Sequence, residues 1–158
     1  MHEVDQLDGR LLRLLAEQPR TSVLEISRRL GVARGTVQAR LDKLLARGVI
    51  ASFAPSLDPG ALGFGVTAFA TLEIKQGRGD AVLAHLERVP EVLEVHKITG
   101  PGDLLCRIVA RDNGDLQRVI DEVVRDHDIE RTSTVISLAA PIRYRVLPLV
   151  AAAAEDVS

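Results

Sequence analysis

Residues 22–47 constrain the fold most, because their pattern is typical of two short helices joined by a tight turn. Ser22 precedes an apolar run and Glu25 follows it by three residues, a spacing that predicts a capping box at a helix start. Gly31 can adopt the left-handed conformation that ends such a helix. A second helix is predicted to begin near residue 34, so the stretch reads as a helix-turn-helix. Its apolar stripe consists of Val37, Leu41, Leu44 and Leu45.

The second helix leaves polar and basic side chains away from this stripe. Reading the major groove of DNA needs short or hydrogen-bonding side chains near the N-terminal end of a recognition helix. Arginine and glutamine suit base edges, whereas lysine suits a phosphate. A solvated basic surface is the alternative, and spacing alone leaves both readings open. The residues expected to read or flank bases are Arg34, Gly35, Thr36, Gln38 and Arg40, and those expected to hold phosphates are Arg28, Arg29 and Lys43.

Charge is divided unevenly along the chain of 158 residues. The net charge of −2 combines +3 in residues 1–50 with −5 in residues 51–158. Residues 20–47 hold seven basic and two acidic side chains. A basic segment on an acidic body is what attraction to DNA phosphates requires, although ordinary surface charge remains the alternative.

The segments around the helix-turn-helix complete a small domain. A leucine-rich helix is predicted over residues 5–18, where Asp5 can cap its start and Pro19 stops it. Residues 49–53, with the sequence VIASF, are partly β-branched and are expected to form a strand-like wing. A turn-rich linker with two prolines follows, which marks a domain boundary.

The second half of the chain shows a strand–helix–strand pattern twice, with helices in the neighbourhood of Asp80 and Asp115. This order predicts a ferredoxin-like βαββαβ domain, an antiparallel sheet with helices on one face. The other face is expected to be apolar and to pack against a partner subunit. Residues expected on that uncovered face are Val66, Ala68, Ala70 and Leu72.

The predicted fold class is therefore α+β, with two domains. A winged helix-turn-helix domain is expected at 1–54, a linker at 55–64, the ferredoxin-like domain at 65–147, and a weakly ordered or peripheral tail at 148–158.

Composition excludes several other classes of protein. No apolar run approaches the ~20 residues that a membrane span needs, and no basic-then-apolar leader opens the chain, so we expect a cytoplasmic protein without a membrane partner. Cys106 lies in an apolar strand and is expected to be a packed thiol, and the four histidines are scattered, which argues against a metal site. With no nucleophile–base set, we expect neither an enzyme nor a cofactor.

The motifs in this order resemble the Lrp/AsnC family, also called feast/famine regulators. The resemblance runs from about Asp5 to Leu138 and rests on LDGRLLRLLAEQPR, the helix-turn-helix, RGVIASFAPSLDPGALG, TGPGD and ERTSTVI. It implies a homodimer, possibly assembled into a tetramer or octamer, that binds promoter DNA. It also implies that an amino acid or related metabolite binds between subunits of the second domain, called the RAM domain. One departure is Ala33, where the family often has a serine that caps the recognition helix.

The TGPGD loop has chemistry of its own. Gly100 and Gly102 let backbone N–H groups approach a carboxylate, and Asp103 could hold an ammonium group. The residues alone favour the alternative, a tight turn with an Asx-type bond, whereas the resemblance favours a ligand site. The implied effector-binding residues are Thr99, Gly100, Pro101, Gly102, Asp103, Thr132, Ser133 and Thr134.

A second function remains open at this point. The chain could be a metabolite-sensing module whose helical domain binds protein and not DNA. A salt titration separates the two hypotheses, because contacts to several phosphates make affinity fall steeply as salt rises.

Overall fold

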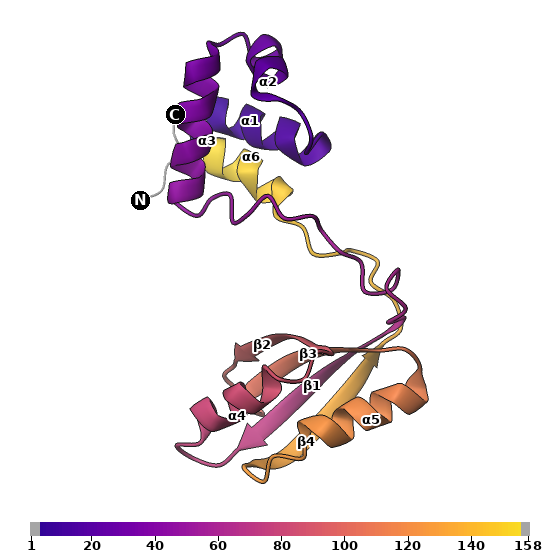
Figure 1. The fold of residues 1–158 in the computed structure, drawn as a ribbon. Helices are drawn as coiled ribbons and strands as arrows, with labels where there is room; N and C mark the ends of the chain where they lie inside the picture. The colour runs from indigo at the N-terminus through magenta and orange to yellow at the C-terminus, as the bar shows by residue number, and fades with distance from the viewer. Residues whose placement is uncertain (1–3, 156–158) are drawn as a thin grey trace. The chain divides into compact units, whose positions relative to one another are not determined.

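The computed structural model describes residues 4–155, and the chain divides into two compact units (Figure 1). The first unit combines the N-terminal segment up to Pro55 with the C-terminal segment from Ile142. The second unit spans Ser56–Pro141. None of the described helices is long and apolar enough to cross a membrane.

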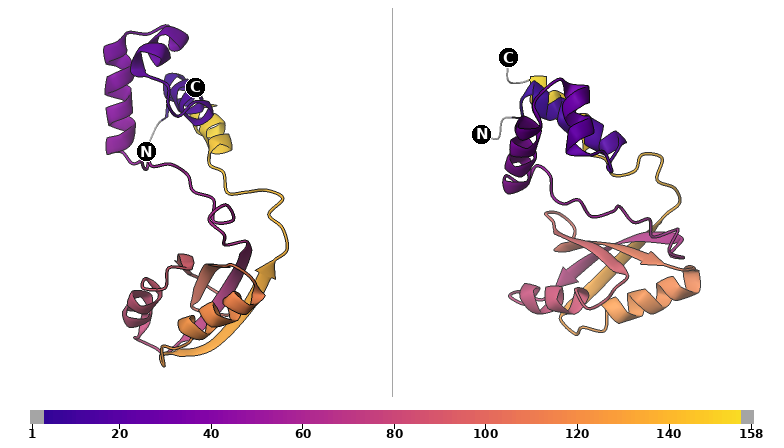
Figure 2. Two further views of the ribbon diagram at one scale, coloured as in Figure 1. Left: turned by 45° about the vertical axis from the view of Figure 1, so that its right-hand side comes forward. Right: turned by 45° about the horizontal axis from the view of Figure 1, so that its top comes forward.

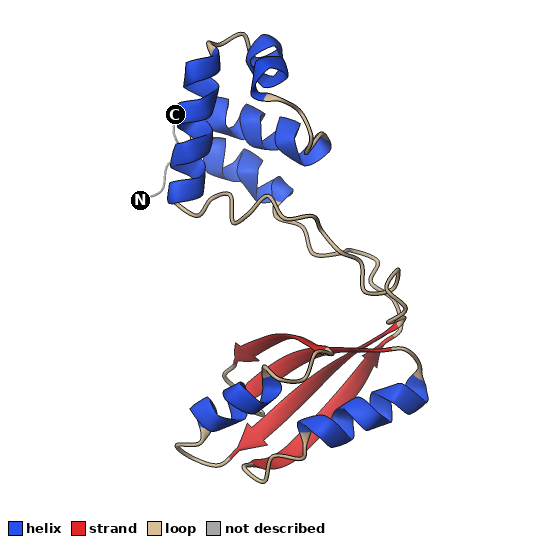
Figure 3. Cartoon of the chain, viewed as in Figure 1, coloured by secondary structure: helices blue, strands red, loops and turns tan. Residues whose placement is uncertain are grey.

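Among the described residues of the first unit, the regular elements are helices joined by loops, as Figure 3 shows by colour. The three helices expected from the apolar periodicity are confirmed, and a fourth comes from the C-terminal segment. They are α1 (Gln6–Glu17), α2 (Val23–Leu30), α3 (Arg34–Ala46) and α6 (Leu147–Glu155). One aliphatic cluster from α1, α2 and α3 forms the core, and its buried members are Leu11, Ile26, Val37, Leu41 and Leu44.

Local capping explains where these helices begin and end. The Ser22 hydroxyl accepts a hydrogen bond from the Glu25 N–H at 3.3 Å, as expected, although the Glu25 carboxylate accepts from Arg29 Nε at 2.8 Å. A full capping box occurs instead at the start of α1, between Asp5 and Asp8. Gly31 ends α2 with a φ of +70°, the left-handed conformation that the turn requires.

The expected wing strand at residues 49–53 is wrong, because the structure has no regular secondary structure there. The N–H groups of Val49 and Ile50 instead donate to the carbonyl oxygen of Leu44, at 2.9 and 3.2 Å, and close the end of α3. Both side chains pack half-buried against the helical core. A strand needs a neighbouring strand for its backbone hydrogen bonds, and all strands of the described residues belong to the sheet of the second unit.

The C-terminal tail, which was expected to be weakly ordered or peripheral, forms a regular helix whose described residues are mostly exposed. Residues 147–155 form α6, which packs on α1 (Figure 1). Gly9 of α1 is buried, and a Cβ at that position would lie 3.4 Å from the Cβ of Ala154 and 3.8 Å from Cγ1 of Val150. Small residues on both helices therefore allow this close packing.

The second unit confirms the predicted βαββαβ order. Its four antiparallel strands lie in the order β2-β3-β1-β4, and Figure 2 shows both helices on one face of the sheet. The elements are β1 (Val66–Ile74), α4 (Gly79–Leu86), β2 (Val92–Lys97), β3 (Leu104–Ala110), α5 (Asn113–Val123) and β4 (Ile129–Ser137).

The face of the sheet was assigned wrongly. Ala68, Ala70 and Leu72 are fully buried, and they share the core with side chains of α4 and α5. Alternation along β1 therefore puts Phe69 and Thr71 on the uncovered face. The physical reason is that small and aliphatic side chains allow helices to pack closely on a strand. The uncovered face mixes apolar and polar side chains, among them Phe69, Leu105 and Val135 beside Thr71, Arg107 and Ser133.

Candidate nucleic-acid interface and ligand loop

Helix α3 presents one face to the core of the first unit and the opposite face to solvent. Val37, Leu41 and Leu44 are buried at 1–7% exposure, and they fix the rotation of the helix about its own axis. Because a helix turns about 100° per residue, Gly35 falls on the far side and Gln38 on the flank of the apolar stripe. Seven of the eight residues predicted to contact DNA are exposed: Arg28, Arg29, Arg34, Gly35, Thr36, Gln38 and Lys43.

The start of α3 is formed by backbone bonds without a side-chain cap. Ala33 makes no side-chain capping hydrogen bond, as the sequence indicated. Its carbonyl oxygen still accepts from the N–H groups of Thr36 and Val37, at 3.0 and 3.2 Å. A helix N-terminus without a capping side chain keeps N–H donors that favour a negatively charged group such as a phosphate.

Two of the exposed polar residues have partners at the surface. Arg29 pairs with Glu25 one turn earlier at 2.8 Å, and both side chains are more than 40% exposed. Gln38 donates from Nε2 to Asp42 Oδ1 at 2.8 Å. Bonds of this exposed kind contribute little to stability, so they leave both side chains able to exchange partners.

Arg40 differs from the other predicted DNA contacts. Its NH1 group donates to Asp8 Oδ1 at 2.9 Å and to Asp5 Oδ2, both at the start of α1. These bonds, first to Asp5 and then to Asp8, raise the pKa of Arg40. Burial by itself would raise the pKa of Asp5, but the hydrogen bonds from Arg40 and from the Asp8 N–H lower this pKa below its usual value. The guanidinium is thus bound inside the first unit.

The role of Asp5 and Asp8 as partners of Arg40 was not visible in the sequence. Asp5 was expected only to cap α1, and the carboxylates lie 35 and 32 residues from Arg40 along the chain. No local pattern of spacing links residues so far apart. Only the packing of α3 on α1 brings them together.

The loop that holds the TGPGD motif connects β2 to β3 and is anchored on β1. The Asp103 N–H donates to the Leu72 carbonyl at 2.9 Å, and the Asp103 carboxylate accepts from the Ile74 N–H at 2.8 Å. A Cβ on Gly102 would clash with Thr71 and lie 3.2 Å from the Leu72 carbonyl oxygen. Gly100 has a φ of +111°, which favours glycine. These bonds and close approaches fix the backbone of the loop.

The three predicted residues of β4 do not all face the same way. Thr132 lies opposite Leu72 and Thr134 opposite Ala70, so both are on the helix-covered side, whereas Ser133 lies opposite Thr71 on the uncovered side. Leu72 also pairs with Leu104, so Asp103 and Thr132 occur at the same end of the sheet. Thr132 Oγ1 is buried and has no hydrogen-bond partner among the described residues.

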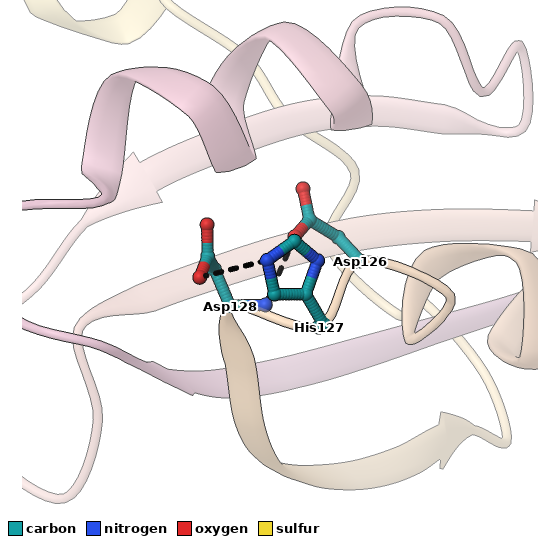
Figure 4. A group of neighbouring side chains, drawn as sticks. All are labelled: Asp126, His127 and Asp128. Carbon is teal, nitrogen blue, oxygen red and sulfur yellow. Dashed lines mark hydrogen bonds and ion pairs between the residues drawn. The ribbon is translucent and has the colours of Figure 1, made fainter.

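A cluster of possible metal ligands lies between α5 and β4 (Figure 4). Asp126, His127 and Asp128 bring ligand atoms within 4.8 Å of one another. The buried Asp128 carboxylate already accepts from Arg78 Nε at 2.6 Å and lies 3.7 Å from Lys75 Nζ. The bond from Arg78 lowers the pKa of Asp128. Two permanent cations therefore balance this carboxylate, and the cluster is explained as a structural ion pair.

Comparison with known proteins covers both units. Residues 4–45 match the family model for the AsnC-type helix-turn-helix domain, and residues 67–147 match that for the Lrp/AsnC ligand binding domain. The chain is 30% identical over 146 residues to the HTH-type transcriptional regulator FL11 from Pyrococcus horikoshii, covering 92% of this chain and 97% of that protein. It is 29% identical to the regulatory protein AsnC from Haemophilus influenzae, covering 94% of this chain and all of that one.

Solved structures show the same architecture. Escherichia coli AsnC superposes with a TM-score of 0.86 at 29% identity, covering 93% of this chain and 100% of that chain. A transcriptional regulator from Neisseria meningitidis, crystallised with L-methionine, superposes with a TM-score of 0.79 at 24% identity. That likeness covers 88% of this chain and 92% of the Neisseria chain.

Proposed function

The chain belongs to the Lrp/AsnC family of transcriptional regulators, and from that premise we propose that α3 reads DNA while the second unit binds an amino acid or related metabolite. Like its relatives, the protein is a DNA-binding transcriptional regulator and not an enzyme. The observation that carries the DNA-reading proposal is the exposed polar face of α3 within a helix-turn-helix of the AsnC type. Because its target is DNA, we place the protein in the cytoplasm.

We assign different tasks on the duplex to the start of α3 and to the exposed cations before and after it. Arg34, Thr36 and Gln38 lie at the start of α3, where side chains of a recognition helix meet base edges. Gly35 lets the backbone come close to the groove, and the uncapped N–H groups before it suit a phosphate. Arg28, Arg29 and Lys43 are exposed cations placed to hold phosphates. Arg40 was expected among the base readers, but its bonds to Asp5 and Asp8 take it out of our set.

A salt titration tests the DNA-reading proposal. Fluorescence anisotropy would measure the affinity of the full chain for a labelled duplex at a series of salt concentrations. Contacts to three phosphates from each subunit of the dimer predict a slope of log affinity against log salt of roughly −5, from about −0.9 per contact. A flat response or no binding would contradict DNA reading and favour a helical domain that binds protein.

For the effector, we propose an amino acid held at the end of the sheet that carries both the TGPGD loop and Thr132 of β4. The backbone N–H groups near Gly100 and Gly102 suit its carboxylate, and the oxygen of Asp103 that Ile74 does not use suits its ammonium group. Thr132 supplies a buried hydroxyl without a partner among the described residues, and Thr99 supplies another in the loop. Ser133 lies on the opposite face of the sheet from Thr132 and would serve a ligand on the uncovered side. The L-methionine complex of the Neisseria regulator supports this class of ligand.

The functional unit in this proposal is a homodimer, which can assemble further into a tetramer or octamer. Two recognition helices would then reach successive major grooves, about 34 Å apart along the duplex. The uncovered face of the sheet supplies a surface for this assembly, with Phe69 half-buried and Val135 62% exposed. An effector bound between subunits would change the affinity for DNA only if it binds one quaternary state more tightly than the other.

A further inference from the structure

Arg40 is in the recognition helix, yet its charged group is bonded to the neighbouring helix α1. We propose that Arg40 is a positioning residue, which locks α3 onto the start of α1 through Asp5 and Asp8 and does not itself contact DNA. The name clasp is used here for these three residues. The proposal rests on α3 being the DNA-reading helix and adds how this helix is held in place.

The burial of Asp8 is the first argument for the clasp. Its side chain is only 4% exposed, although a carboxylate is costly to bury unless it is paired. Besides the bond from Arg40, the Asp8 carboxylate accepts a long hydrogen bond of 3.4 Å from the Asp5 N–H. Arg40 therefore supplies the positive charge and the strong hydrogen bond that this buried group requires.

The position of Arg40 on α3 is the second argument. It borders the apolar stripe, three residues after Val37 and one before Leu41, and its side chain is 30% exposed. It also lines a small hollow together with Leu7, Leu11 and Val37. A guanidinium in this place is directed to α1, and it would have to leave two carboxylates before it could reach a phosphate.

The third argument is that the clasp joins the start of α1 to the half of α3 that carries the proposed base readers. Asp5 and Asp8 form the capping box of α1, and Arg40 lies two residues after Gln38 and four after Thr36. Fixing Arg40 fixes the rotation and tilt of the half of α3 that carries the proposed base readers. The clasp thus relates to the sequence specificity of binding, and not only to the stability of the fold.

Removing an acid from the clasp distinguishes this role from a phosphate contact by the sign of its effect. Asp8→Asn removes a negative charge from the DNA-binding unit. If Arg40 held a phosphate, this change would free it and leave DNA binding equal or tighter. If Arg40 is a positioning residue, the same change weakens binding to the specific site. Asp5→Asn is the milder companion, because asparagine caps a helix as well as aspartate does.

The experiment uses the full chain, a duplex selected from a random pool by the wild-type protein, and a duplex of unrelated sequence. Anisotropy would be measured for Asp5→Asn, Asp8→Asn and Arg40→Gln well below the unfolding temperature of each variant. We expect specific affinity to fall about tenfold, non-specific affinity to stay within about twofold, and the salt slope to remain unchanged. Glu17→Gln, which removes an exposed acid at the far end of α1, is the control and should bind as wild type.

Two results would overturn the clasp. One is unchanged or tighter specific binding by both acid variants. The other is a salt slope that becomes shallower by about two units in Arg40→Gln, since that change reports one lost phosphate contact in each subunit of the dimer. If the wild type binds no DNA, the DNA-reading proposal fails on its own, and the clasp is tested by thermal unfolding. The double variant Arg40→Gln with Asp8→Asn should then lose less stability than the sum of the losses in the two single variants.

Discussion

Single residues in this protein are fixed by contacts that a sequence does not display. Arg40 looks like the other basic residues of its helix, but 32 residues separate it from the buried carboxylate it pairs with. Asp103 was weighed as a turn residue against a ligand residue, and it in fact binds the Ile74 N–H of another strand. Both residues were predicted as site residues from their residue type, Arg40 as a DNA contact and Asp103 as an effector contact. Their partners depend on tertiary packing, which spacing along the chain does not encode.

Gly102 gives a prediction about stability. A Cβ there would meet Thr71 and the backbone oxygen of Leu72, and a backbone atom in a sheet cannot move aside easily. We expect Gly102→Ala to destabilise the second unit by about 1–3 kcal/mol, as overpacking does. Gly65→Ala is the matched control, because nothing lies within 4 Å of its Cβ position. Thermal unfolding followed by circular dichroism would measure both, and equal melting temperatures would contradict the proposed close packing.

Asp103 gives a prediction about the effector. Asp103→Asn keeps an oxygen that can accept from the Ile74 N–H but removes the charge proposed to hold an ammonium group. Since a hydrogen bond to a charged group contributes about 1.5–3 kcal/mol, we expect amino-acid affinity to fall at least tenfold. Isothermal titration calorimetry with a panel of amino acids would first identify the effector for the wild type. Unchanged affinity in both Asp103→Asn and Asp103→Ala would exclude Asp103 from the site.

At the scale of elements, α6 gives a prediction that pairs two neighbouring alanines. Ala154 packs on Gly9 of α1, whereas Ala153 is exposed. Ala154→Leu should therefore force α6 away from α1 and lower the stability of the first unit by about 1–3 kcal/mol. Ala153→Leu should have little effect. Equal melting temperatures for the two variants would mean that this helix does not pack on α1 in solution.

Most helices and strands could be predicted from periodicity, because apolar side chains recur at helical spacing in α1, α2 and α3 and the strands alternate with turns. The errors occurred where an element depends on a neighbour. VIASF is β-branched, but it has no strand to pair with and instead closes α3. The helix in the tail was not predicted, although alanine favours helices and Pro148 is tolerated in the first turn of a helix. Alternation in β1 showed two faces, but not which of them the helices cover.

At the scale of the whole molecule, the uncovered face of the sheet gives a prediction about assembly. Val135 is 62% exposed beside Phe69, which is an unfavourable position for apolar groups unless a partner covers them. We expect Val135→Glu to reduce the molecular mass measured by light scattering after size exclusion. Val124→Glu changes an exposed valine at the end of α5, on the helix-covered side, and should leave the mass unchanged. The same mass for both variants would place the subunit contact elsewhere.

A hydroxyl-radical footprint of the full chain on its selected duplex tests the central claim most directly. If paired subunits each insert α3 into a major groove, the backbone should be protected in two patches about 10 base pairs apart. A panel of amino acids added to the same reaction should change that protection for at least one member. Protection confined to one patch would contradict this arrangement. So would protection that persists unchanged in Arg34→Ala and Gln38→Ala.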